Sequence, residues 1–145
     1  MIYKATKDDV HTLAELAVMM WSSHSVEELE KGFEAAVNSD KAAVFIALSD
    51  GVIVGFAQCS LRYDYVEGTS SSPVGYLEGI FVKSEHRKQG YAGQLLDRCE
   101  KWAESKGCSE FASDCELSND TSLDFHLNSG FKEAGRIICF TKSLI

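Results

Sequence analysis

The chain has 145 residues, of which 45% are apolar, and its 22 Asp and Glu residues against 14 Lys and Arg residues give a formal net charge of −8. This length predicts one domain, residues 1–145, with a single core, and the single proline argues against linkers or disorder. Nucleic acid is disfavoured as a partner, because its binding requires clustered cations that displace counterions. A cationic substrate would be attracted, although acidity for solubility alone also explains the charge.

No N-terminal segment shows the charged-then-apolar pattern of a signal peptide, and no apolar run approaches the ~20 residues of a membrane-spanning helix. We therefore expect a cytoplasmic protein with no membrane partner. The five cysteines are odd in number and include no C-x-x-C pair, so neither a disulfide framework nor a zinc site or other metal is predicted.

The N-terminal part of the chain predicts one strand and two helices. A short strand at residues 2–5 is followed by a helix start at residues 6–9, with acids in the first turn. Trp21 stands at the end of that helix. Ser25 and Glu28 form a capping box that begins the second helix.

The remainder alternates between strands and helices. Asp50-Gly51 is a strong hairpin signal, and residues 68–73 predict a loop. A helix follows Gly90, and another begins near Asn119. The strands are expected at residues 42–49, 52 to about 66, 76–82, 110–115 and 137–141. The order is β-α-α-β-β-β-α-β-α-β, an α/β protein with a mixed central sheet and helices on both faces.

The loop at residues 87–92 separates the strand at 76–82 from the long helix. It places a glycine and a small residue where the helix begins, next to the cations of His86, Arg87 and Lys88. Unpaired N–H groups and the positive end of the helix dipole suit an anion there, such as a phosphate. An ordinary turn with a solvated basic loop is the alternative. The phosphate loops of P-loop enzymes and of dinucleotide dehydrogenases are absent.

Arg87-x-x-Gly90-x-Ala92 resembles the acyl-CoA signature [QR]-x-x-G-x-[GA] of the GNAT N-acetyltransferases, and the element order is the GNAT order over the full length. The resemblance implies acetyl-CoA as cosubstrate, with its pyrophosphate on the loop amides and its pantetheine arm along the strand at residues 79–82. The expected acetyl-CoA contacts are Ile80, Phe81, Val82, Arg87, Lys88, Gln89, Gly90, Tyr91, Ala92 and Asn119. For Asn119, capping alone would also explain the residue.

A narrower resemblance rests on stretches spread over most of the chain: Trp21-Ser22 and residues 62–69, 72–75, 77–82 and 110–114. These are similar to one branch of the aminoglycoside 6′-N-acetyltransferases. That resemblance implies an aminoglycoside cleft lined by Glu78 and Asp114, with Trp21 against the sugar. It also implies that Tyr65 reaches a neighbouring subunit's site in a homodimer.

The chemistry of the proposed reaction explains these residue types. The amine of a polycationic sugar must lose a proton before it attacks a thioester, and a carboxylate or a relayed water can accept that proton. Glu78, beside the expected thioester, is the better candidate for the base, and Asp114 for binding charge. The alternatives are a Glu78 carboxylate satisfied by backbone N–H groups and a Trp21 that is simply core.

His126 stands four residues before Gly130-Phe131, where many GNAT enzymes carry a tyrosine that protonates the departing CoA thiolate. A histidine could supply that proton, or it could be a capping or packed residue. No Cys-His nucleophile pair is evident, so we predict direct acetyl transfer in a ternary complex, with the oxyanion held by a backbone N–H near Ile80. The rival functions are acetylation of a polyamine or a protein N-terminus, and a non-catalytic CoA-binding regulatory module.

Overall fold

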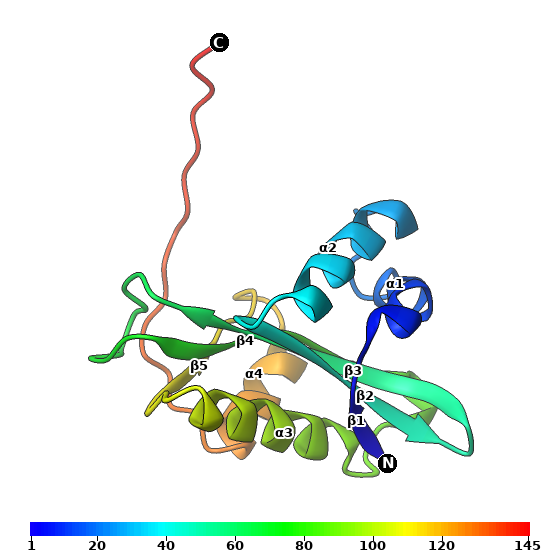
Figure 1. The fold of residues 1–145 in the computed structure, drawn as a ribbon. Helices are drawn as coiled ribbons and strands as arrows, with labels where there is room; N and C mark the ends of the chain where they lie inside the picture. Colours follow the sequence, from blue (N-terminus) through cyan, green and yellow to red (C-terminus); the bar gives the residue numbers. More distant parts are fainter.

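A five-stranded sheet separates two layers of helices (Figure 1) in the computed structural model, which describes residues 1–145. The strands lie in the order β1-β2-β3-β4-β5, and all neighbours are antiparallel except the parallel pair β4–β5. Their bounds are β1 Ile2–Lys4, β2 Ala42–Ser49, β3 Val52–Arg62, β4 Val74–Val82 and β5 Phe111–Ser113. Helices α1 (Val10–Ala17) and α2 (Val26–Asn38) cover one face, and α3 (Tyr91–Ser105) and α4 (Asp120–Asn128) cover the other. This arrangement confirms the predicted fold class.

Local sequence signals account for several element boundaries. Thr6 caps the short 3-10 helix η1 (Lys7–Asp9), and Ser25 caps α2 through the predicted capping box with Glu28. The turn residues Asp50 and Gly51 have φ angles of 49° and 77°, the left-handed region that a tight two-residue hairpin requires. These signals were read correctly because each depends only on residues close in the chain.

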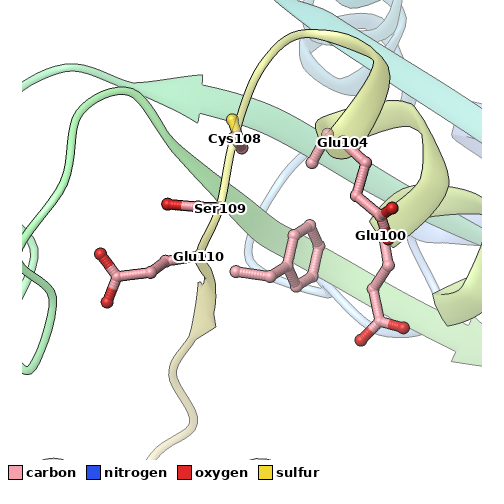
Figure 2. Close-up of a pocket in the computed structure, with 7 residues that line it drawn as sticks. Glu100, Glu104, Cys108, Ser109 and Glu110 are labelled. Atoms are coloured by element: carbon pink, nitrogen blue, oxygen red, sulfur yellow. The ribbon is translucent and has the colours of Figure 1, made fainter.

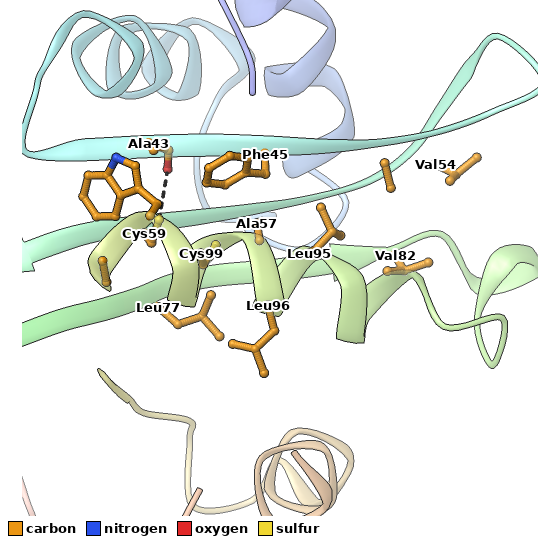
Figure 3. Close-up of a cluster of buried hydrophobic side chains, with 13 residues drawn as sticks. Ala43, Phe45, Val54, Ala57, Cys59, Leu77, Val82, Leu95, Leu96 and Cys99 are labelled. Atoms are coloured by element: carbon orange, nitrogen blue, oxygen red, sulfur yellow. Dashed lines mark hydrogen bonds between the residues drawn. The ribbon is translucent and has the colours of Figure 1, made fainter. Parts of the chain in front are cut away.

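Apolar side chains fill both sides of the sheet. On one side, α3 packs Leu95, Leu96 and Cys99 against the strands (Figure 3). Within this cluster the Cys59 thiol donates to the Ala43 carbonyl at 3.7 Å. The hydrogen bond to Cys59, together with burial, raises the pKa of the Cys99 thiol, so both sulfurs are inert core atoms. The other side joins α1 and α2 to the sheet through a separate cluster that includes Phe33 and Phe56.

Several predicted bounds were wrong. The first strand ends at Lys4, β4 begins at Val74, and α1 ends at Ala17, so Trp21 lies four residues beyond the helix that it was expected to end. The strand expected at residues 52 to about 66 ends at Arg62, and the one expected at 110–115 covers only Phe111–Ser113, so Asp114 follows its strand. The strand expected at 137–141 does not form: residues 131–145 belong to no helix or strand, and the C-terminal segment extends away from the body (Figure 1). A strand requires a paired neighbour, and no strand of the same chain pairs with this segment.

Strands β4 and β5 separate soon after they meet. Their parallel register joins Gly75–Leu77 only to Phe111–Ser113. The rest of β4, from residue 78 to residue 82, has no partner on this side and presents free backbone groups at the carboxyl end of β5. In open α/β sheets such a position is where ligands bind.

Candidate active site

Glu78 lies at an irregularity in β4. The pairing of β3 with β4 joins Gln58 to Gly79 and Cys59 to Leu77, so Glu78 is the extra residue of a β-bulge. A bulge interrupts the ladder and redirects a side chain. Leu77 belongs to the apolar cluster on the α3 side, and alternation therefore turns the Glu78 side chain toward the face of α1 and α2.

The Glu78 carboxylate is held by side chains of the neighbouring strand β3. The Arg62 guanidinium donates from Nη2 to Oε1 at 2.8 Å and from Nε to Oε2 at 3.3 Å, and the Ser60 hydroxyl donates to Oε2. The alternative that backbone N–H groups satisfy this acid is therefore wrong. The Arg62 and Glu78 side chains retain 43% and 28% exposure, so the pair is partly exposed to solvent and does not belong to the core.

Asp114 is joined to the same group of residues through Tyr76. The Tyr76 hydroxyl donates to Asp114 Oδ2, and the Arg62 guanidinium carbon lies 3.5 Å from the centroid of the Tyr76 ring. Burial, and secondly the hydrogen bond to Asp114, raise the pKa of Tyr76 well above its usual range. The hydrogen bond to Glu78 raises the pKa of the Arg62 guanidinium. We call Ser60, Arg62, Tyr76, Glu78 and Asp114 the charged cluster.

The Trp21 ring packs against the backbone of β4 at Gly79, the residue that follows Glu78. A Cβ atom on Gly79 would stand 2.5 Å from Trp21 Cζ2 and 2.8 Å from Cη2, so the missing side chain makes room for the indole ring. The ring also packs on Phe33 and Phe56, with centroid distances of 6.4 and 5.8 Å. Trp21 is thus both partly core and partly exposed next to Glu78.

The predicted phosphate loop has the backbone expected of it. Gly90, with φ +88°, precedes the first turn of α3, and no side chain caps this helix. Its first N–H groups are therefore available to an anion. Lys88 also adopts a positive φ of 62°, and Arg87 Nε donates to the Val82 carbonyl at 2.9 Å, which ties the loop to the end of β4. The remaining predicted contacts line this junction: Ile80 and Phe81 on the free part of β4, Gln89 in the loop, and Tyr91 and Ala92 in the first turn.

His126 does not join the charged cluster. Its Nε2 lies 2.8 Å from the hydroxyl of Ser113, which alternates with Asp114 and so faces the α3 side. Its Nδ1 lies 2.6 Å from the Ser122 carbonyl, which can only accept, so Nδ1 carries a proton. In the neutral ring Nε2 then accepts from Ser113. Nearby, Asn119 caps α4 by accepting from the Ser122 N–H at 3.1 Å, which leaves its amide NH2 group for a ligand.

Tyr65 is isolated from the other predicted site residues. It lies in the loop after β3, and its side chain is 75% exposed. Its hydroxyl accepts from the Gly68 N–H at 3.4 Å. Within one chain it has no contact with Glu78 or Asp114.

Two hollows of the surface lie outside the charged cluster. One of about 510 Å³ lies between the end of α3 and the start of β5, and its lining includes the three acids Glu100, Glu104 and Glu110 (Figure 2). Burial raises the pKa of Glu100, whereas a hydrogen bond from Ser71 lowers the pKa of Glu110. A second hollow of about 690 Å³ includes Gly90 and Gly93, beside the uncapped end of α3. No group of three or more metal-ligating side chains is arranged to hold an ion.

Residues 9–131 match the acetyltransferase (GNAT) family. The chain belongs to the GNAT acetyltransferases. Relatives named aminoglycoside N(6′)-acetyltransferase type 1 include one from Salmonella typhimurium, 42% identical over 127 residues and 88% of each chain, and one from Serratia marcescens, 37% identical over 145 residues and 99% of each chain.

Solved structures of GNAT enzymes with this fold include AAC(6′)-Iy bound to CoA-S-monomethyl-acetylneamine, a bisubstrate analogue. That chain superposes on this one with a TM-score of 0.94 at 38% identity, covering 99% of this chain and 97% of that one. AAC(6′)-Iy bound to CoA superposes with a TM-score of 0.95 at 39% identity, covering 98% and 93%. None of the helices is long and apolar enough to cross a membrane.

Sequence reasoning missed Ser60, Arg62 and Tyr76. All three lie on β3 or β4, and their side chains reach Glu78 or Asp114 only through the register of those strands. The available signal was alternation: Ser60 and Arg62 on one strand, and Tyr76 and Glu78 on the other, share a face. In the sequence, Arg62 and Tyr76 stand only within longer stretches, residues 62–69 and 76–82, and nothing local sets them apart.

Proposed function

We propose that this GNAT enzyme transfers the acetyl group of acetyl-CoA to the 6′-amine of aminoglycosides, and thereby confers antibiotic resistance. The observation that carries the proposal is the charged cluster, where two carboxylates from adjacent strands flank the free part of β4. An acid pair beside a flat Trp21 ring suits a sugar that carries several ammonium groups. The relatives' names and the bisubstrate complex of AAC(6′)-Iy support the same substrate class.

The residues present fit acetyl-CoA. Free backbone groups of β4 at residues 79–82 can pair with an amide-containing arm, and the uncapped N-terminus of α3 can hold phosphate oxygens. Acetyl-CoA supplies the activated acetyl group. Asp114 and Trp21 bind and orient the aminoglycoside, and Glu78 takes a proton from the amine, directly or through water. In the net reaction an N–C bond forms, the C–S bond breaks, and the thiolate gains a proton.

His126 is the proposed source of that last proton. It lies across the sheet from Glu78, so the acid and the base would act from opposite sides of the acetyl group. To donate from Nε2 the ring must be protonated there and must release Ser113. A second solution consistent with the geometry is that His126 only orients the sulfur.

We also propose that the protein is a cytoplasmic homodimer. The segment after residue 136 is unpaired and carries Ile137, Ile138 and Phe140 at 77%, 81% and 87% exposure, which is costly in water. A second copy of the chain would cover these side chains and bring Tyr65 close to a neighbouring cleft. Sedimentation should give about twice the 16.0 kDa chain mass. An active monomer at micromolar concentration would remove the role of Tyr65.

Thiol release from acetyl-CoA tests the function. The acceptors are neamine, its analogue with a hydroxyl at the 6′ carbon, spermidine and a short peptide. The proposal expects release with neamine and none with the 6′-hydroxyl analogue, because the other amines of the two sugars are the same. Release only with spermidine or the peptide would favour the rival amine substrates, and no release with CoA binding intact would favour a regulatory module.

A further inference from the structure

Arg62 and Tyr76 connect the two acids of the site. Arg62 binds Glu78 through two nitrogen atoms and stacks on the Tyr76 ring, while the Tyr76 hydroxyl binds Asp114. Arg62 lies on β3, Tyr76 and Glu78 lie on β4, and Asp114 directly follows β5, so the connection crosses the sheet where β4 and β5 begin to separate.

The contacts of Glu78 leave it little freedom. A carboxylate offers about four lone-pair positions. Oε2 accepts from Ser60 and from Arg62 Nε, and Oε1 accepts from Arg62 Nη2, so one position on Oε1 stays free. A planar guanidinium bound at two atoms also fixes the plane of the carboxylate, which a lysine ammonium cannot do. The free position on Oε1 is therefore held in one direction.

Tyr76 supports both halves of the connection. Its side chain is only 6% exposed, so the ring is a fixed surface behind the half-exposed Arg62 guanidinium. Its hydroxyl uses its single proton on Asp114 Oδ2 and fixes that acid in turn. Because the Arg62 guanidinium bonds to Glu78 and also interacts with the charge of Asp114, it offsets part of the negative charge, while two carboxylates and one guanidinium still leave a net negative charge for a cationic substrate.

We propose that Arg62 and Tyr76 are positioning residues, which hold Glu78 and Asp114 in the orientations that proton transfer and amine binding require. The inference rests on the proposed function, and it deepens it by assigning the residues that make the two acids competent. A positioning residue acts only through the residue that it holds. Its effect must therefore vanish when that residue is already disabled.

Two double-mutant cycles measure this dependence, with neamine as acceptor. Arg62→Ala should lower kcat by about 10²-fold, because misplacement of a reacting group has effects of that size. In the Glu78→Gln background the same change should alter kcat by no more than about threefold. Tyr76→Phe keeps the ring behind Arg62 and removes the hydroxyl; its effect on the KM for neamine should disappear in the Asp114→Asn background.

Matched variants separate positioning from stability and from charge. Arg62→Lys keeps the charge but not the two-point contact, so its kcat should resemble that of Arg62→Ala. Lys101→Ala removes an exposed ion pair with the same 2.8 Å separation, on α3, and should leave kcat unchanged. The affinity for acetyl-CoA and the melting temperature, measured for every variant, show that the folded enzyme is being compared.

Additive effects in both cycles would overturn the proposal. A lower KM for neamine with unchanged kcat in Arg62→Ala would also overturn it, since Arg62 would then be a cation that competes with the substrate. If the wild-type enzyme does not acetylate neamine but acetylates spermidine or the peptide, the proposed function fails. The cycles are then run with that acceptor, so failure of the proposed function and failure of the positioning role remain distinct. No turnover with any acceptor would remove both proposals.

Discussion

The two faces of the sheet carry different kinds of side chain. On the α3 side, residues of β2, β3, β4 and α3 form an apolar cluster of which Leu95 and Cys99 are fully buried. On the α1 and α2 side, the apolar cluster stops short of the end of β3, and Arg62, Glu78 and Asp114 take its place. The comparison teaches that one face mainly stabilises the fold and that the other combines stability with chemistry.

The difference originates in a single interruption of β4. Up to Leu77 the strand alternates regularly and pairs on both edges. At Glu78 the bulge breaks the alternation and the pairing with β5 ends. Charged side chains are tolerated there because Arg62 and Glu78 are paired and remain partly exposed to water.

The first prediction disables the chemical face without touching the apolar one. Glu78→Gln should lower kcat by ~10²–10⁴-fold, the usual loss for a general base, whereas Asp114→Asn should mainly raise the KM for the aminoglycoside. Steady-state kinetics with neamine measure both. Neither change should weaken acetyl-CoA binding, because the groups proposed to hold acetyl-CoA are backbone groups of residues 79–82 and of the first turn of α3.

The roles are reversed if Asp114→Asn loses kcat while Glu78→Gln keeps it across the neutral pH range. If both variants keep kcat, solvent deprotonates the amine and the two acids only bind charge.

The second prediction disables the apolar face without touching the chemical one. Leu95→Ala removes a side chain with 0% exposure and should cost about 2–5 kcal/mol of unfolding free energy. The kcat per folded molecule should not change, and urea unfolding combined with active-site titration measures the two quantities separately. A Leu95→Ala enzyme that stays stable but loses kcat would show that the two faces are not independent.

The third prediction concerns α3. Its buried side chains belong to the apolar cluster, and its first turn belongs to the proposed acetyl-CoA site. Gly90→Ala should weaken acetyl-CoA binding, because φ +88° costs an L-residue about 1–2 kcal/mol and the loop must shift. Gly107→Ala is the matched control: its φ is +91° and nothing lies within 4 Å of an added Cβ, but it stands at the other end of α3. Calorimetry should show a loss of acetyl-CoA affinity only for Gly90→Ala. Equal losses for both variants would contradict the proposed binding of phosphate by the loop at residues 87–92.

The smallest expected effect is a dependence of stability on pH. Burial raises the pKa of Tyr76 above the value of 10.0 that a tyrosine has when unfolded, so above about pH 10 the unfolded chain binds fewer protons than the folded one. The stability of the wild-type protein should therefore fall as pH rises through this range. Tyr76→Phe should fall less steeply, and identical slopes in alkaline urea titrations would contradict the burial of this hydroxyl.

Sequence reasoning succeeded where the cause is local. The capping box at Ser25, the hairpin at Asp50-Gly51 and the N-cap at Asn119 each involve residues only a few positions apart. The element order followed from these signals and from apolar periodicity. The family resemblance singles out Glu78 and Asp114, which periodicity alone could not distinguish from other strand acids, and their roles stay predictions.

Sequence reasoning failed where the pairing of distant strands determines the structure. Residues 137–141 have the composition of a strand, but composition does not provide a partner. The Arg62 contact with Glu78 depends on where β3 aligns with β4 and on the bulge that the alignment contains. The register of β3 against β4 and the position of the bulge both depend on residues that are distant in the chain. Neither can be predicted from the local sequence pattern.

Gly79 determines how closely the Trp21 ring can approach β4, and this spacing does not depend on the charged side chains nearby. A Cβ atom at this position would stand 2.5 Å from the Trp21 ring, so any side chain there requires the ring to move, whereas the hydrogen bonds of Glu78 and Asp114 involve neither Gly79 nor Trp21. One substitution can therefore change which sugar rings fit without altering proton transfer. Under the proposed function, the range of accepted sugars and the rate of proton transfer would therefore depend on different residues, the first on Gly79 and Trp21 and the second on Glu78.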